Sequence, residues 1–182
     1  MTEKPAQTRL VTIGLVNPKS PTNVGGVMRA AGCYQADEVR YTGKRYALAA
    51  SHRGEQYNTD TKRVSRNIPL IGVDNLLDGL DEDTQVICVD LVEGAIPLPE
   101  FQHPDKAIYL FGPEDGTIDQ SLVDNADAVV YVPTVGCMNL ASSVNVLLYD
   151  RLAKSNTQGS DELIRQSRDT NNRVKVKDHK NA

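Results

Sequence analysis

The sequence contains no tryptophan, two phenylalanines, three cysteines and no run of eighteen apolar residues. The absence of such a run argues against a membrane-spanning helix, and no apolar signal-peptide segment follows the opening MTEKPAQTRL. The cysteines Cys33, Cys88 and Cys137 are odd in number and lack close Cys or His partners, which argues against disulfides and a zinc site. We therefore expect a cytoplasmic protein that contacts no membrane and holds no metal.

Two nucleotide-binding patterns are also missing. Neither GxGxxG nor a P-loop occurs, which weakens assignment to dinucleotide or nucleoside triphosphate enzymes. Apolar residues make up 40% of the 182 residues, enough for one buried core, and we expect one domain over residues 1–154. Residues 155–182 have almost no large apolar side chains and predict a polar, disordered tail, either an electrostatic arm for RNA or a solubilising segment.

The net charge of −4 conceals an uneven distribution along the chain. Residues 74–127 contain fourteen acidic residues and a single base, Lys106, whereas residues 40–66 contain seven basic residues and two acidic ones. The basic stretch is either a phosphate-binding surface or an ordinary solvated one. Its candidate substrate-binding residues are Lys44, Arg45 and Arg53.

Short β-rich runs alternate with helical patterns, which predicts an α/β domain with a mostly parallel sheet and helices on both faces. The predicted strands are residues 10–16, 38–42, 68–73, 85–91, 106–111 and 128–132. Helices are predicted to begin near Asn23, Asp74 and Asp119, and the side chains of Asn23 and Asp74 suit an N-cap. A long final helix is predicted over residues 139–154, and the side chain of Asn139 suits its N-cap. An apolar stripe of this helix is predicted to pack on the sheet or on a partner, and it consists of Leu140, Val144, Leu147, Leu148 and Leu152.

Three segments carry residues that suit a binding site. Residues 17–34 place Gly25 and Gly26 inside a helix, where each glycine costs about 1 kcal/mol relative to alanine. Either the glycines let the helix pack tightly on the sheet, with Arg29 as a surface charge, or a ligand approaches the helix there. Residues 109–119 contain the end of an apolar strand followed by Gly112, Pro113 and Glu114, and residues 131–152 contain the end of another strand, a loop with Pro133 and a helix. Since ligands bind beyond the carboxyl ends of parallel strands, the two similar strand ends predict one shared pocket.

Taken together and in this order, these segments resemble the three motifs of the SpoU family of RNA ribose methyltransferases, in the SPOUT superfamily. The resemblance covers residues 10–152 and rests on three groups of residues: Asn23 with Arg29, Phe111 with Gly112 and Glu114, and Val132 and Pro133 with Cys137, Met138 and Asn139. The third motif departs from the family. Its loop is shorter than usual, and Cys137 stands where the family commonly has a serine, which is a stronger hydrogen-bonding group.

The resemblance implies a fold, a cofactor and an assembly. The fold is a Rossmann-like sheet whose carboxyl-terminal third forms a deep trefoil knot, a rare exception to unknotted topology. The cofactor is S-adenosylmethionine, surrounded by Leu91, Gly112, Val132, Cys137 and Leu140. The assembly is a homodimer in which Arg29 works near the subunit interface.

The implied reaction is methylation of a ribose 2′-hydroxyl in RNA, with tRNA favoured over ribosomal RNA because compact members of the family act on tRNA. Since arginine stays protonated, we expect Arg29 to hold the adjacent phosphate and to stabilise the developing alkoxide rather than to act as a base. Asn23 and Glu114 are expected to orient Arg29, and Asn139 is expected to fix the loop of the third motif. The alternatives are a non-catalytic RNA-binding or assembly protein with the same scaffold, and a flavodoxin-like or Rossmann domain acting on a small molecule.

Overall fold

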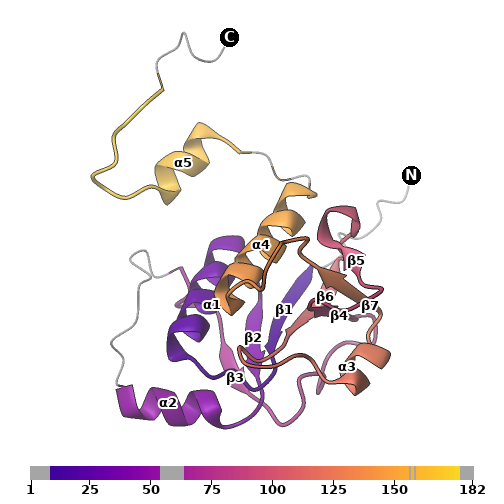
Figure 1. Ribbon diagram of the computed structural model, residues 1–182. Helices are drawn as coiled ribbons and strands as arrows, with labels where there is room; N and C mark the ends of the chain where they lie inside the picture. The colour runs from indigo at the N-terminus through magenta and orange to yellow at the C-terminus, as the bar shows by residue number, and fades with distance from the viewer. Residues whose placement is uncertain (1–8, 54–63, 156, 158, 177–182) are drawn as a thin grey trace.

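Seven parallel strands form one sheet in the order β3-β2-β1-β6-β4-β7-β5 (Figure 1). The computed structural model describes residues 9–53, 64–155, 157 and 159–176. The strands are β1 (Leu10–Leu15), β2 (Glu38–Tyr41), β3 (Leu70–Gly72), β4 (Gln85–Val89), β5 (Ile96–Pro97), β6 (Lys106–Phe111) and β7 (Ala128–Tyr131). The predicted α/β fold with a parallel sheet is confirmed, while the knot stays a prediction.

The sheet is buried on both faces, as the continuously apolar strands predict. Alternate residues of β6 point to opposite faces, so Tyr109 and Phe111 join one apolar cluster whereas Ile108 and Leu110 join the other. The larger cluster contains the buried residues of helices α1 (Pro21–Tyr34) and α4 (Leu140–Ala153). The smaller one contains residues from α3 (Gln120–Asp124) and from the turns at residues 74–80.

Helices α1 and α4 lie against each other on the larger cluster (Figure 1). A Cβ atom added to Gly26 of α1 would lie 2.8 Å from the Cβ of Ala141 in α4. The glycine therefore lets the two helices approach closely, and the close neighbour at Gly26 is helix α4 rather than the sheet that the sequence analysis expected. In α4, Leu140, Val144, Leu147 and Leu148 are buried, as the predicted stripe requires, but Leu152 is 38% exposed.

The predicted start of α1 at an Asn23 cap is wrong. The helix begins at Pro21, and its N-cap is Ser20, whose hydroxyl accepts a hydrogen bond from the amide of Asn23 at 3.3 Å. Proline is well suited to the first turn, because its fixed φ angle matches the helix and its missing N–H would have no helical partner there. The side chain of Asn23 is thereby free for another contact.

The prediction of a helix after Asp74 is also wrong, because residues 74–80 form turns. The Asn75 side chain accepts a hydrogen bond from the amide of Leu77 at 3.0 Å, and Gly79 has a φ angle of 69°. In addition, the guanidinium of Arg40 donates to the carbonyl of Asp78 at 2.6 Å. Local side-chain bonds and Arg40 thus replace the bonds of a helical turn.

Four elements are absent from the sequence prediction: α2 (Arg45–Arg53), β5, a 3-10 turn (Leu98–Glu100) and α5 (Asp161–Ser167). Helix α5 lies within the tail that was predicted to be disordered. It contains no buried residue, so it adds nothing to the core, and the domain boundary at residue 154 stays a prediction.

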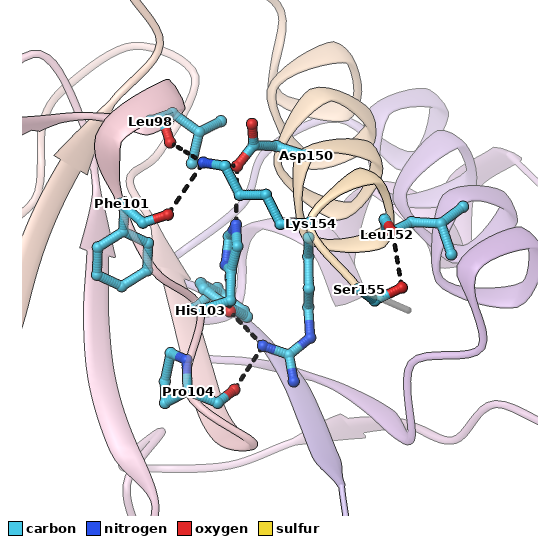
Figure 2. Close-up of polar contacts among 10 residues, drawn as sticks. Leu98, Phe101, His103, Pro104, Asp150, Leu152, Lys154 and Ser155 are labelled. Carbon is cyan, nitrogen blue, oxygen red and sulfur yellow. Dashed lines mark hydrogen bonds and ion pairs between the residues drawn. The ribbon is translucent and has the colours of Figure 1, made fainter. Parts of the chain in front are cut away.

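A buried polar network anchors the carboxyl end of α4 to the segment before β6 (Figure 2). The His103 ring, 5% exposed, contacts the Tyr109 hydroxyl through Nδ1 at 2.8 Å and Asp150 through Nε2 at 2.9 Å. Arg151 donates to the same hydroxyl at 2.8 Å, and Lys154 contacts Asp150 at 2.6 Å. When His103 is neutral with its proton on Nε2, the ring donates to Asp150 and accepts from the Tyr109 hydroxyl, which in turn accepts from Arg151.

Candidate functional site

A cavity of about 180 Å³ lies where β4, β6 and β7 end. In the sheet register Leu15, Val89 and Phe111 lie side by side, so the segments that follow these strands meet at one edge. The cavity is lined by Val89, Asp90, Leu91, Phe111, Gly112, Pro113, Glu114, Gly116, Tyr131, Val132, Thr134, Cys137, Met138, Leu140 and Ser143. The shared pocket predicted from the two strand ends is present at the expected edge.

All five residues that the sequence assigns to the cofactor line this cavity: Leu91, Gly112, Val132, Cys137 and Leu140. Each follows a strand or opens α4, so the parallel sheet brings them together although they are far apart in the sequence. Whether they bind a cofactor stays a prediction. Glu114 lines the same cavity, whereas Asn23, Arg29 and Asn139 do not.

Asp90 is the main cavity residue that the sequence analysis missed. One carboxylate oxygen accepts hydrogen bonds from the Thr117 hydroxyl at 2.7 Å and from the Ile118 amide at 3.1 Å. The carboxylate therefore joins the end of β4 to the loop after β6. Its position directly after the apolar run QVICV was the available signal, because a charge there lies at the carboxyl edge of the sheet.

Gly112 packs against its own loop. A Cβ atom at this position would lie 3.1 Å from the backbone nitrogen of Ile118 and 3.2 Å from the carbonyl carbon of Thr117. A side chain larger than hydrogen would therefore push on the loop backbone as well as on the cavity. Glycine is therefore required at this position for the loop to pack. A bulky substitution at Gly112 would disturb the fold as well as the cavity, so it is a poor test of ligand binding.

Glu114 joins the second segment to the first turn of α1. Its carboxylate accepts hydrogen bonds from the amides of Lys19 at 2.8 Å and Ser20 at 2.9 Å, and from the side-chain amide of Asn23 at 3.1 Å. Partial burial by itself would raise the pKa of Glu114, but these donors together hold that pKa below its usual value. The carboxylate is thus ionised and fully used in holding the loop before α1.

Asn23 and Asn139 extend this connection to the third segment. The side-chain amide of Asn139 donates to the Asn23 carbonyl oxygen at 2.7 Å, and its own oxygen caps α4 by accepting from the amide of Ala141 at 2.9 Å. The predicted cap at Asn139 is therefore confirmed. Glu114, Asn23 and Asn139 form a continuous chain of hydrogen bonds, which we call the three-segment bridge.

Arg29 is separate from the three-segment bridge. Six residues of helix turn Arg29 about 120° around the axis from Asn23 and move it about 9 Å along the axis. Its side chain is exposed, and among the described residues none makes a hydrogen bond or ion pair with it. Within one chain, neither Asn23 nor Glu114 contacts Arg29, so no contact of the described residues supports the expected orienting role.

The predicted substrate-binding residues of the basic stretch have different surroundings. Arg45 opens α2 and contacts both carboxylate oxygens of Asp115, at 2.9 and 2.8 Å, whereas Lys44 is exposed. The side chain of Arg53 lies outside the part of the chain that the structure describes. Arg40 faces inward, where it binds Glu38 and the carbonyls of Leu76 and Asp78. Its guanidinium is thus occupied by internal acceptors.

No group of three or more His, Cys, Asp or Glu side chains is arranged to hold a metal ion in residues 9–53, 64–155, 157 and 159–176. Within these same stretches, none of the helices has both the length and the apolar character needed to cross a membrane.

Solved structures of SpoU-type proteins share this fold at low sequence identity. One, from work on 2-OH methylation of C/U34 on tRNA, is 20% identical with a TM-score of 0.67, over 80% of this chain and 96% of that one. The A. aeolicus TrmH/SpoU tRNA modifying enzyme is 17% identical with a TM-score of 0.65, over 81% and 75%. The SpoU methyltransferase AviRb from Streptomyces viridochromogenes, in complex with AdoMet, is 18% identical with a TM-score of 0.61, over 82% of this chain and 62% of that one.

The chain therefore spans less than two thirds of the length of AviRb. No curated protein sequence matches it. A family model matches residues 10–149, which include the sheet, the cavity and most of α4. The chain belongs to the SpoU rRNA methylase family.

Proposed function

We propose that the chain is an S-adenosylmethionine-dependent methyltransferase that modifies a ribose 2′-hydroxyl in RNA. The observation that carries the proposal is the convergence on one cavity of five residues that follow three different strands, β4, β6 and β7: Leu91, Gly112, Val132, Cys137 and Leu140. Membership in a family of RNA methylases also supports it.

The cavity suits a cofactor that has an apolar body and a positive charge. Leu91, Val132 and Leu140 supply apolar surface, while Asp90 and Glu114 are acidic, and none of the described lining residues is basic. When bound, S-adenosylmethionine supplies an electrophilic methyl group on a positively charged sulfonium. The lining residues would hold the cofactor, and the backbone bends after β6 and β7 would enclose it.

Arg29 is proposed to bind the phosphate beside the target ribose and to stabilise the negative charge that develops on the 2′-oxygen. Its guanidinium is exposed and has no partner among the described residues, so it is available to an external acceptor. A guanidinium binds phosphate through two parallel N–H groups and stays protonated, so the hydroxyl proton leaves to water or to phosphate. The three-segment bridge joins the first turn of α1, the helix that carries Arg29, to two loops that line the cavity.

The proposed substrate is tRNA in preference to ribosomal RNA, and the proposed working form is a homodimer. A solved relative that this chain matches over 96% of its length comes from work on tRNA, which supports the first proposal. For the second, α4 carries exposed apolar side chains at Val146, Tyr149 and Leu152, spaced three residues apart on one face. An adjacent subunit would cover this face and bring a second chain near α1.

Titration calorimetry with S-adenosylhomocysteine tests the cofactor site. Cys137→Trp fills the cavity from an exposed position, so we expect the affinity to fall at least about tenfold. Val135→Trp is the matched control, because Val135 lies in the same loop, is fully exposed and does not line the cavity, and it should change affinity less than about twofold. Absence of wild-type binding at millimolar ligand would favour the non-catalytic RNA-binding protein instead.

A further inference from the structure

Asp115 holds two cations beside the candidate site. Its carboxylate accepts two hydrogen bonds from Arg45 Nη2, at 2.9 and 2.8 Å, and one from Lys19 Nζ at 3.4 Å. Asp115 lies between Glu114 and Gly116, which both line the cavity. The two cations come from different parts of the chain, the loop before α1 and the start of α2, and meet on this one carboxylate.

The positions of these groups are set by the backbone. Glu114 is fixed on the amides of Lys19 and Ser20, so the residue that follows it is held beside the Lys19 side chain. Hydrogen bonds from Arg45 hold the pKa of the Asp115 carboxyl below its usual value, and those from Lys19 act in the same direction. The carboxylate is therefore a negative charge held at a defined place beside the cavity.

The contact adds little to the stability of the fold. The side chains of Lys19, Arg45 and Asp115 are 63%, 32% and 49% exposed, and ion pairs with this exposure are weak. By contrast, Arg40 is 13% exposed and is bound by internal acceptors. Among the described residues, Asp115 supplies the acceptors of the Arg45 guanidinium, so Arg45 can be released without leaving a buried group unpaired.

We propose that Asp115 occupies the place of an RNA backbone phosphate on Arg45 and Lys19, and that the substrate displaces it when it binds. A phosphodiester has the same charge as a carboxylate and also offers two acceptor oxygens, which suits the same pair of cations. Asp115 is thus an internal competitor that lowers the affinity for RNA. The inference rests on the proposed function, since it requires an RNA substrate at this edge of the sheet.

The test is a double-mutant cycle for binding of labelled total tRNA, measured by fluorescence anisotropy. At about 50 mM salt, where phosphate contacts are strong, Asp115→Asn should bind about three- to tenfold more tightly than wild type. The control Asp119→Asn removes an equal exposed charge four residues away and keeps a residue suited to cap α3, so it should change affinity less than about twofold. In a Lys19→Ala/Arg45→Ala background, which removes both cations that Asp115 holds, Asp115→Asn should give no gain.

The salt dependence gives a second readout. Arg45→Ala should reduce the slope of log affinity against log salt by about 0.7 to 0.9, which corresponds to one lost phosphate contact, whereas Asp115→Asn should leave the slope unchanged. The inference is overturned if Asp115→Asn gains no more than Asp119→Asn, if the gain persists without both Lys19 and Arg45, or if wild type binds no tRNA. The proposed function is judged separately by S-adenosylhomocysteine calorimetry, which should be unchanged in all these variants.

Discussion

At the scale of single residues, the amide of Asn23 meets two opposite requirements. It donates to Glu114 at 3.1 Å and accepts from Asn139 at 2.7 Å. A carboxylate accepts but cannot donate, and an apolar side chain does neither. An amide is therefore the side chain that can join the first turn of α1 to the loops on both sides of it.

Asn23→Asp tests this requirement, because it keeps the acceptor for Asn139 but places a second carboxylate against Glu114. We expect a loss of about 1–3 kcal/mol in the free energy of unfolding at pH 7. The loss should shrink near pH 5, since repulsion raises the pKa of one member of the pair, and protonating it removes the repulsion. Urea denaturation at both pH values measures the effect. The control is Asn145→Asp, an exposed amide of α4 that bonds only within its helix; equal losses for both variants would contradict the interpretation.

Arg29→Ala should abolish RNA methylation while leaving S-adenosylhomocysteine affinity within about twofold of wild type. The reason is that the exposed guanidinium lines no part of the cavity, so its removal affects the RNA side of the reaction. Arg29→Lys is the graded control, because it keeps the charge but loses the planar fork, and it should retain only part of the activity. Methylation of total tRNA with labelled cofactor is the assay, and full activity in Arg29→Ala would reject the assignment.

The position of the cavity was predictable because glycine and proline directly follow two apolar strands, whereas the five residues assigned to the cofactor came from the resemblance to the SpoU family. Asp90 also directly follows an apolar strand, but it was missed because the resemblance did not assign it a role. The contact between Asn23 and Asn139 could not be predicted, since it joins residues 116 positions apart and depends on how α1 and α4 pack. The ion pair between Asp115 and Arg45 could not be predicted either, because the sequence does not show which exposed charges lie next to each other.

At the scale of secondary-structure elements, predictability followed the strength of the apolar pattern. Strands β4, β6 and β7 and helix α4 have continuous or regularly spaced apolar residues, and their predicted positions are correct to within a few residues. Helix α2 was missed because it buries little apolar surface. Strand β5 was missed because its two residues are too few to show an apolar pattern. The sequence of residues 74–80 resembles a capped helix, but local bonds from Asn75 and bonds from the distant Arg40 hold these residues as turns.

The anchor of α4 gives a prediction for pH dependence. Burial lowers the pKa of His103, and the charges of Arg151 and Lys154 lower it further against the opposing effect of Asp150. The unfolded chain, with a His pKa of about 6.5, takes up this proton first. The stabilisation is therefore complete above about pH 6.5 and is lost as the pH falls from there toward the lowered folded pKa.

Urea denaturation at pH 7.5 and pH 5.5 measures this loss. We expect the free energy of unfolding of the wild type to decrease between the two, and His103→Gln to be less stable at pH 7.5 but less dependent on pH. Tyr109→Phe, which removes the hydroxyl acceptor of Arg151 and keeps the histidine, should retain a pH dependence. An identical pH profile for wild type and His103→Gln would rule out the buried ring as its source.

At the scale of the whole molecule, the proposed homodimer can be tested through the exposed face of α4. Tyr149 is 61% exposed there, and Tyr149→Glu should raise the dissociation constant of the dimer by at least about tenfold, because burying a charge in an apolar interface is costly. Sedimentation equilibrium measures it. Leu48→Glu on α2 changes a residue of similar exposure, 60%, and should leave the association unchanged. A monomeric wild type would refute the assembly.

The sheet order has a consequence for how the chain is made. Strand β6 lies between β1 and β4 although both precede it in the sequence. A nascent chain that ends before Lys106 contains β1 and β4 but lacks the strand that lies between them. The facing edges of β1 and β4 are then unpaired, because the two strands are too far apart to pair with each other. Completion of the scaffold waits until the sixth strand emerges from the ribosome, so the amino-terminal half depends on its own later sequence for protection from aggregation.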